Sequence, residues 1–261
     1  MTWDPGALPR GEGVVRLELD GRMARVVFDN PTARNAMSPG MMSDLVQIVE
    51  RLASTELAVV ILSGAGSRAF CSGGDLRSVA AHLMEPENAA GMCAVMTDVL
   101  ERMSQLPAVI LAAVEGAALG GGAEILTAVD GVVAAKSARI GFIHGSLGVS
   151  PGWGGGGRLV RRVGSRRALQ ILSRARRMTA EEAAHVGMVD AISEEGQAVA
   201  AAEAWAEEIC RNPTSAVQGA VRLVRAHRDQ PEVAGTVERS VFGELWGGPA
   251  HKAALQRVLK K

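Results

Sequence analysis

Alternating and apolar positions near the start of the chain predict a pair of β-strands. Residues 14–19 and 23–28 are rich in apolar and β-branched side chains, and Asp20-Gly21-Arg22 lies between them. Asp-Gly is a favoured turn between antiparallel strands. The pattern therefore predicts that the chain opens with a β-hairpin.

The segment after the predicted hairpin shows the spacing of a helix. Ser38 can cap a helix that has Pro39 at its first position. Apolar side chains then recur at Leu45, Val49 and Leu52, which lie on one face of such a helix. We therefore expect a helix that begins after Ser38.

Two later runs, residues 58–62 and 109–114, are continuously apolar, as expected of strands covered on both faces. A loop over residues 64–75 is expected between them, with helical stretches around 76–83 and 87–103. Further glycines follow the second run, before another helical stretch from Ala123 and a strand at 131–135. Glycine loops at strand ends in an α/β fold indicate the side where ligands bind.

The pattern becomes mostly helical after residue 154. Thr179 and Glu182 fit a capping box. Further helices are expected from Ala198, Thr214, Glu232 and Ala250. Because no linker separates this part, we predict a core over residues 1–195 with a helical extension over 196–261 that packs on its own core or on a neighbouring subunit.

Composition and charge exclude several classes. A chain of 261 residues with 48% hydrophobic content can bury a full core. Its 28 basic and 28 acidic residues leave no basic excess to attract nucleic acid or an anionic membrane. No apolar run reaches the roughly 18 residues of a membrane span, and the first residues lack the pattern of a signal peptide. We expect a protein of the cytoplasm or an organelle matrix, with no nucleic-acid or membrane partner.

Metal and disulfide chemistry are not indicated. Cys71, Cys93 and Cys210 are far apart and form no Cys-x-x-Cys pair, so buried thiols are expected. The five histidines show no zinc-site spacing. The sequence therefore predicts no metal.

Two glycine-rich segments resemble nucleotide-binding loops only in part. Gly64-Ala-Gly66-Ser-Arg-Ala69 follows a strand, but the dinucleotide fingerprint needs a helix to begin inside the motif, whereas residues 70–74 continue as loop. Residues 152–157 lack the Lys-Ser/Thr of a phosphate-binding P-loop. A nicotinamide-dependent dehydrogenase is therefore disfavoured, and nucleotide titration would test it.

Gly120-Gly121-Gly122 lies where a strand passes into a helix. Glycines there leave backbone N–H groups open to a ligand oxygen, and one such donor in an oxyanion site is worth about 3 to 4 kcal/mol. The same spacing also fits tight packing of helix against strand. The glycines alone do not distinguish the two.

Together with a second glycine turn, Ser72-Gly73-Gly74-Asp75, these features resemble the crotonase (enoyl-CoA hydratase/isomerase) superfamily. The resemblance covers residues 33–38, 69–76, 116–124, 147–155 and 178–189. It implies an α/β fold, the crotonase (ClpP-like) spiral of repeated ββα units with a helical C-terminal trimerisation region. It also implies a homotrimer or a dimer of trimers.

The family resemblance implies a site. Each of two loops would contribute one N–H to an oxyanion hole, here from Gly74 and Gly121. A channel for coenzyme A would be lined by Arg34, Ala36, Asp75, Leu76 and Arg77. Coenzyme A would enter only as part of an acyl-CoA thioester substrate, with no separate cofactor. Arg34 taken alone fits a phosphate contact or a solvated surface arginine.

The family's hydratases use two glutamates, and here only the first is present, as Glu124. His144 occupies the second position. A Glu with a His resembles the ethylmalonyl-CoA and methylmalonyl-CoA decarboxylase branch, as do Phe142, Trp153 and Trp246-Gly-Gly-Pro. This branch implies loss of carbon dioxide from a 2-carboxyacyl-CoA through an enolate.

In that chemistry Phe142 and Trp153 would surround the substrate carboxylate, and Glu124 or His144 would return a proton to carbon. Two alternatives remain. One is hydration or isomerisation of an unsaturated acyl-CoA, and the other is an acyl-CoA-binding protein without catalysis. A lone histidine is also commonly structural.

Overall fold

The computed structural model describes residues 4–78, 86–246 and 248–259. A six-stranded sheet has the order β1-β2-β3-β5-β7-β10, and a smaller four-stranded sheet has the order β4-β6-β8-β9. The strands of the larger sheet are β1 (Val14–Asp20), β2 (Met23–Asp29), β3 (Val59–Gly64), β5 (Val109–Val114), β7 (Gly131–Ala135) and β10 (Ala191–Ser193). The predicted α/β class is confirmed.

The N-terminal hairpin is confirmed, because β1 and β2 pair antiparallel with Asp20 opposite Met23. β3, β5 and β7 then pair in parallel, and almost every residue in them is buried. Both faces are covered, as their unbroken apolar sequences predict. On one face α8 (Ala198–Cys210) contributes Ala198, Ala202 and Ala206, which follow one another at helical spacing.

The other face of the sheet carries the main core. Phe28, Leu62 and Ala112 join apolar side chains of α1 (Pro39–Ala53) and α3 (Pro86–Ser104) there. Ser38 caps α1 as expected, since its Oγ accepts a hydrogen bond from the N–H of Met41.

The smaller sheet corrects the expectation of a continuous loop over residues 64–75. Its strands are β4 (Ala69–Cys71), β6 (Ala117–Leu119), β8 (Arg139–Gly141) and β9 (Met178–Thr179). Strands of two or three residues are too short to show an alternating pattern. Because β4 and β6 pair in parallel, the turns that follow them lie at the same edge.

Short helices connect this sheet to the remainder. They are α4 (Gly121–Ile125), α5 (Gly155–Val163), α6 (Ser165–Arg174), α7 (Ala180–His185) and the 3-10 helices η3 (Leu126–Ala128) and η4 (Ile143–Leu147). Two further 3-10 helices, η1 (Pro5–Ala7) and η2 (Pro31–Ala33), lie before β1 and between β2 and α1. The capping box of Thr179 and Glu182 is present at the start of α7. Of the helix expected over 76–83, residues 76–78 are helical and the remainder lies outside the described residues.

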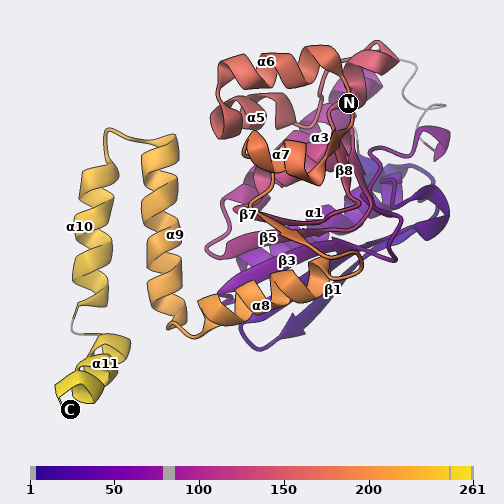
Figure 1. Cartoon of the computed structure of the whole chain (residues 1–261). Helices are drawn as coiled ribbons and strands as arrows, with labels where there is room; N and C mark the ends of the chain where they lie inside the picture. Colours follow the sequence, from indigo (N-terminus) through magenta and orange to yellow (C-terminus); the bar gives the residue numbers. More distant parts are fainter. Residues whose placement is uncertain (1–3, 79–85, 247, 260–261) are drawn as a thin grey trace.

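The chain ends in α9 (Thr214–Asp229), α10 (Ala234–Leu245) and α11 (Pro249–Leu259). Figure 1 shows α8 along the sheet, whereas α10 and α11 stand away from it. Arg225 of α9 donates to the carbonyl of Ala108 (3.1 Å), which fastens α9 beside β5. No helix in the described part of the chain is long and apolar enough to span a lipid bilayer.

Candidate active site

Backbone hydrogen bonds hold the segment before α1 against the turn that follows β4. The N–H of Met37 donates to the carbonyl of Gly73 (2.8 Å), and the N–H of Asp75 donates to the carbonyl of Met37 (2.9 Å). In this parallel bridge the residue between the two, Gly74, directs its own N–H away from Met37. The amide of Gly74 therefore faces the opposite side of the turn.

Asn35 fixes the position of this segment. Arg34 and Asn35 both have left-handed backbone conformations, with φ of 54° and 56°. The Nδ2 of Asn35 donates to the carbonyls of Ala65 (3.1 Å) and Ala69 (2.7 Å), and its Oδ1 accepts from the N–H of Asn30 (2.9 Å). Asparagine tolerates this conformation better than most residues. Its role was not predicted, although its type and conformation could have suggested one.

The residues predicted to contact coenzyme A lie together. A pocket of about 340 Å³ is lined by Arg34, Ala36, Asp75, Leu76 and Arg77, with Gly74 at the same pocket. Leu76 is 62% exposed, so it presents apolar surface to the pocket. Within the described ranges, the guanidinium groups of Arg34 and Arg77 form no ion pair with a carboxylate.

The glycine triplet joins the two turns. A Cβ at Gly73 would lie 3.4 Å from the backbone nitrogen of Gly121, so the turns after β4 and β6 meet here. Gly121 is the first residue of α4, and its N–H has no acceptor within the helix. A Cβ at Gly122 would collide with the carbonyl of Cys71. Gly122 is therefore tightly packed, while the neighbouring Gly121 has a backbone N–H without an intrahelical acceptor.

Trp153 lies against both predicted amide donors. Its side chain is buried, and a Cβ at Gly121 would collide with its indole. A Cβ at Gly74 would lie 3.8 Å from its Cζ2. The indole therefore forms an apolar wall beside the two glycines.

Glu124 is 1% exposed and accepts backbone hydrogen bonds through both carboxylate oxygens. Its Oε1 accepts from the N–H of Gly152 (3.2 Å), and its Oε2 accepts from Trp153 (2.8 Å) and Gly155 (2.9 Å). These amides lie at the N-terminus of α5, where a negative charge is stabilised. The glycine run that resembled a P-loop therefore binds a carboxylate of its own chain.

His144 lies beside Glu124, and the two side chains form a pair. Its Nε2 lies 3.0 Å from Oε1 of Glu124, and its side chain is 12% exposed. The ring centroid of Phe142, which is fully buried, lies 6.1 Å from that of His144. Oε1 of Glu124 therefore lies between the N–H of Gly152 and the imidazole of His144. The Nδ1 atom is buried without a hydrogen-bond partner in the described structure.

Cys93 of α3 lies close to the pair of Glu124 and His144. The sequence did not indicate this proximity. A Cβ at Gly152 would lie 2.6 Å from its Sγ. Burial raises the pKa of Cys93, and the charge of Glu124 raises it further. Among the residues that the structure describes, no three His, Cys, Asp or Glu side chains cluster as metal ligands; the expectation of no metal remains a prediction.

Comparison with known proteins gives the family. The model of the enoyl-CoA hydratase/isomerase family matches residues 18–257. The chain is 41% identical to an ethylmalonyl-CoA decarboxylase of Danio rerio over 95% of this chain and 84% of that protein, and 39% identical to one of Gallus gallus over 90% and 80%. An enoyl-CoA hydratase structure from Bacillus anthracis superposes with a TM-score of 0.88 at 28% identity, covering 94% of this chain and 96% of that one. The chain therefore belongs to the enoyl-CoA hydratase/isomerase family.

Proposed function

We propose that this protein removes the carboxylate of a 2-carboxyacyl-CoA, of the ethylmalonyl-CoA or methylmalonyl-CoA type, as carbon dioxide. The observation that carries the proposal is the contact of 3.0 Å between His144 and Glu124. A hydratase of this family would have a second glutamate in place of this histidine. Ethylmalonyl-CoA decarboxylases at 41% and 39% identity support the same assignment.

The coenzyme A portion would bind in the pocket that Arg34, Leu76 and Arg77 line. The two guanidinium groups suit phosphate oxygens, and Leu76 offers apolar contact to the pantetheine arm. This position directs the thioester toward Gly74, which lines the same pocket. No separate cofactor is needed, because coenzyme A is part of the substrate.

The thioester oxygen would accept hydrogen bonds from the amides of Gly74 and Gly121. The bond between C2 and the carboxylate breaks, and its electron pair moves onto the thioester as an enolate while carbon dioxide leaves. Preorganised amides stabilise the charge that develops on oxygen. The apolar wall of Trp153 leaves the substrate carboxylate less solvated than in water, which favours its loss.

The enolate then needs one proton at C2. We assign this proton to the pair of Glu124 and His144. Before the transfer the pair must hold one proton more than it does when the glutamate is ionised and the histidine is neutral. After transfer, Glu124 remains ionised, His144 is neutral, and solvent restores the proton. The atoms balance, because one carboxylate is lost as carbon dioxide and one proton replaces it.

A substrate panel tests the proposal. Purified protein is incubated separately with ethylmalonyl-CoA, methylmalonyl-CoA and crotonyl-CoA, and thioesters are followed by mass spectrometry. We expect at least one malonyl-type thioester to lose carbon dioxide. Fast hydration of crotonyl-CoA without any decarboxylation would overturn the proposal in favour of a hydratase, and tight binding without any product would favour a non-catalytic acyl-CoA-binding protein.

We further propose that the C-terminal helices assemble the chain into a trimer or a dimer of trimers. Phe242 and Trp246 are each 63% exposed, and their rings stack with centroids 5.2 Å apart. They line an apolar pocket of about 550 Å³ among α9, α10 and α11. Exposed aromatic surface of this kind favours burial against another chain. Light scattering should give three or six times the mass of one chain, and a monomer would contradict the proposal.

A further inference from the structure

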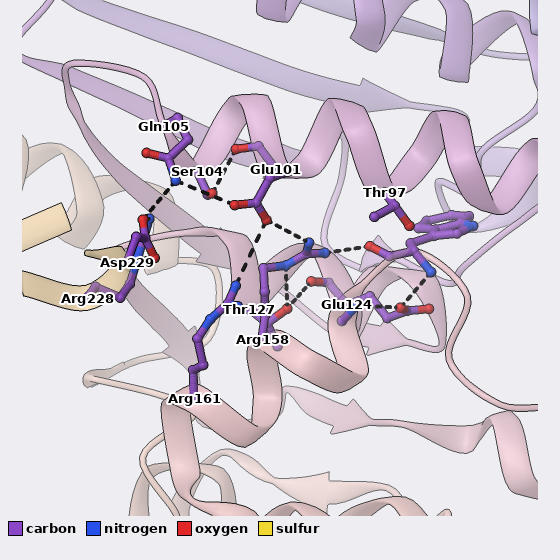
Figure 2. Close-up of polar contacts among 12 residues, drawn as sticks. Thr97, Glu101, Ser104, Gln105, Glu124, Thr127, Arg158, Arg161, Arg228 and Asp229 are labelled. Carbon is purple, nitrogen blue, oxygen red and sulfur yellow. Dashed lines mark hydrogen bonds and ion pairs between the residues drawn. The ribbon is translucent and has the colours of Figure 1, made fainter. Parts of the chain in front are cut away.

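Arg158 is a buried cation beside the proposed site. It lies in the first turn of α5 and is 5% exposed. Its Nη2 donates to the carbonyl of Trp153 (2.6 Å), and its Nε donates to Oγ1 of Thr127 (3.2 Å). Figure 2 shows the guanidinium between Glu101 and Thr127.

Both hydrogen bonds lead to Glu124. The hydroxyl of Thr127 donates to the backbone carbonyl of Glu124 (2.6 Å). The carbonyl of Trp153 belongs to the peptide group that lies between the two amides, of Trp153 and Gly155, that hold the Oε2 of Glu124. Arg158 therefore holds this turn through the carbonyl of Trp153, while Glu124 holds it through the amides of Trp153 and Gly155.

Burying the guanidinium of Arg158 here costs it the hydration that it would have in water. Burial lowers the pKa of its guanidinium, and the carboxylates of Glu101 and Glu124 raise it. Glu101 offers only a contact of 3.8 Å and is 46% exposed, so its compensation is screened by solvent. An apolar side chain would fill the same space without loss of hydration. The cation is therefore explained by what its hydrogen bonds hold in place.

We propose that Arg158 is a positioning residue for the reaction. By fixing the peptide between Trp153 and Gly154, it keeps two amides on Glu124 and the indole of Trp153 against Gly121. The kinetic test of this inference rests on the proposed function. The position of the turn, which hydrogen exchange tests, does not depend on any particular substrate. Coenzyme A would bind elsewhere, at the pocket of Arg34, so Arg158 should act on the chemical step.

The kinetic test compares Arg158→Met with Arg158→Lys. Methionine fills similar space but donates no hydrogen bond, so we expect kcat to fall about tenfold or more while KM stays within about twofold. Lysine can donate to the carbonyl of Trp153 as a point charge without the fork of arginine, and should restore part of kcat. A wild-type kcat in folded Arg158→Met, or an equal loss in both variants, contradicts the inference.

Arg162, one turn later on α5, offers a matched control. Its guanidinium also donates to backbone carbonyls, those of Leu126 (3.2 Å), Val129 (3.0 Å) and Gly187 (3.0 Å), but it does not bond the turn at Trp153. Arg162→Met should lower the melting temperature yet leave kcat within about twofold. If it lowers kcat as much as Arg158→Met does, the role of Arg158 is structural only.

Hydrogen exchange separates this inference from the proposed function. In Arg158→Met the amides over residues 152–155 should exchange faster than in wild type, and in Arg162→Met they should not. Equal exchange in wild type and Arg158→Met overturns the positioning role, whether or not the protein decarboxylates any thioester. If Arg158→Met does not fold, Arg158→Lys carries the exchange test, because lysine lacks the fork that bonds both the carbonyl of Trp153 and the hydroxyl of Thr127, and unchanged exchange over residues 152–155 there likewise overturns the positioning role.

Discussion

The indole of Trp153 occupies the space that a side chain at Gly121 would need. Gly121→Ala should therefore displace either the indole or the amide of residue 121. Loss of one oxyanion donor costs about a hundredfold or more in kcat, and we expect a loss of that size in decarboxylation assays. A folded Gly121→Ala protein with kcat within threefold of wild type, on the scale of about 0.7 kcal/mol, would contradict the proposed role of this amide.

Gly157 provides the control for that substitution. It lies inside α5 with no atom near the position of a Cβ. Gly157→Ala should leave kcat unchanged and stabilise the fold by about 0.5–1 kcal/mol, because alanine has the higher helix propensity. Thermal and denaturant unfolding would measure the change.

The Glu124 and His144 pair should behave as one unit. Glu124→Gln would direct an NH₂ group at amide donors that now meet a carboxylate, and His144→Ala would remove the other member. Each should lower kcat about a hundredfold or more. Since both act on the same proton, the double variant should be about as slow as the slower single one. Multiplied losses in the double variant would argue for independent roles.

Much of the fold follows from the sequence. The hairpin at Asp20-Gly21 and the buried strands β3, β5 and β7 depend on local pattern and appear as predicted. The starts of α8 and α9 match, while α10 begins at Ala234, two residues after the expected Glu232. The strands of the smaller sheet were missed because their pairing, rather than their composition, defines them.

The candidate site was predictable only in part. The resemblance named Glu124 and His144, and the structure brings them to 3.0 Å. It could not show that three backbone amides hold Glu124, since these come from a turn about thirty residues later whose position depends on tertiary packing. Arg158 was missed for the same reason, because its bond to the turn goes to the backbone carbonyl of Trp153, which leaves no mark on the sequence.

The arginines of the coenzyme A pocket should affect binding rather than chemistry. Arg34→Ala or Arg77→Ala should raise KM about tenfold with little change in kcat, because phosphate contacts form equally in ground state and transition state. A pantetheine thioester without the nucleotide should not respond to either change. Arg174, which is exposed and lies outside this pocket, serves as control. A fall in kcat with unchanged KM would place these arginines in another role.

Cys71 should resist alkylation. Burial raises the pKa of its thiol to about 12, so the reactive thiolate is scarce at pH 8. After treatment of the folded protein with iodoacetamide, mass spectrometry should find Cys71 unmodified, whereas denatured protein should be modified at Cys71, Cys93 and Cys210 alike. Rapid labelling of Cys71 in the folded state would show that the core opens locally.

The convergence of the Gly74 and Gly121 amides on one thioester oxygen is tested most directly by a crystal structure with butyryl-CoA, the product expected from ethylmalonyl-CoA. We expect the thioester oxygen within about 2.7–3.1 Å of both backbone nitrogens, with C2 facing the pair of Glu124 and His144. A thioester oxygen that reaches only one of the two amides, or neither, in a fully occupied complex would contradict the proposed activity.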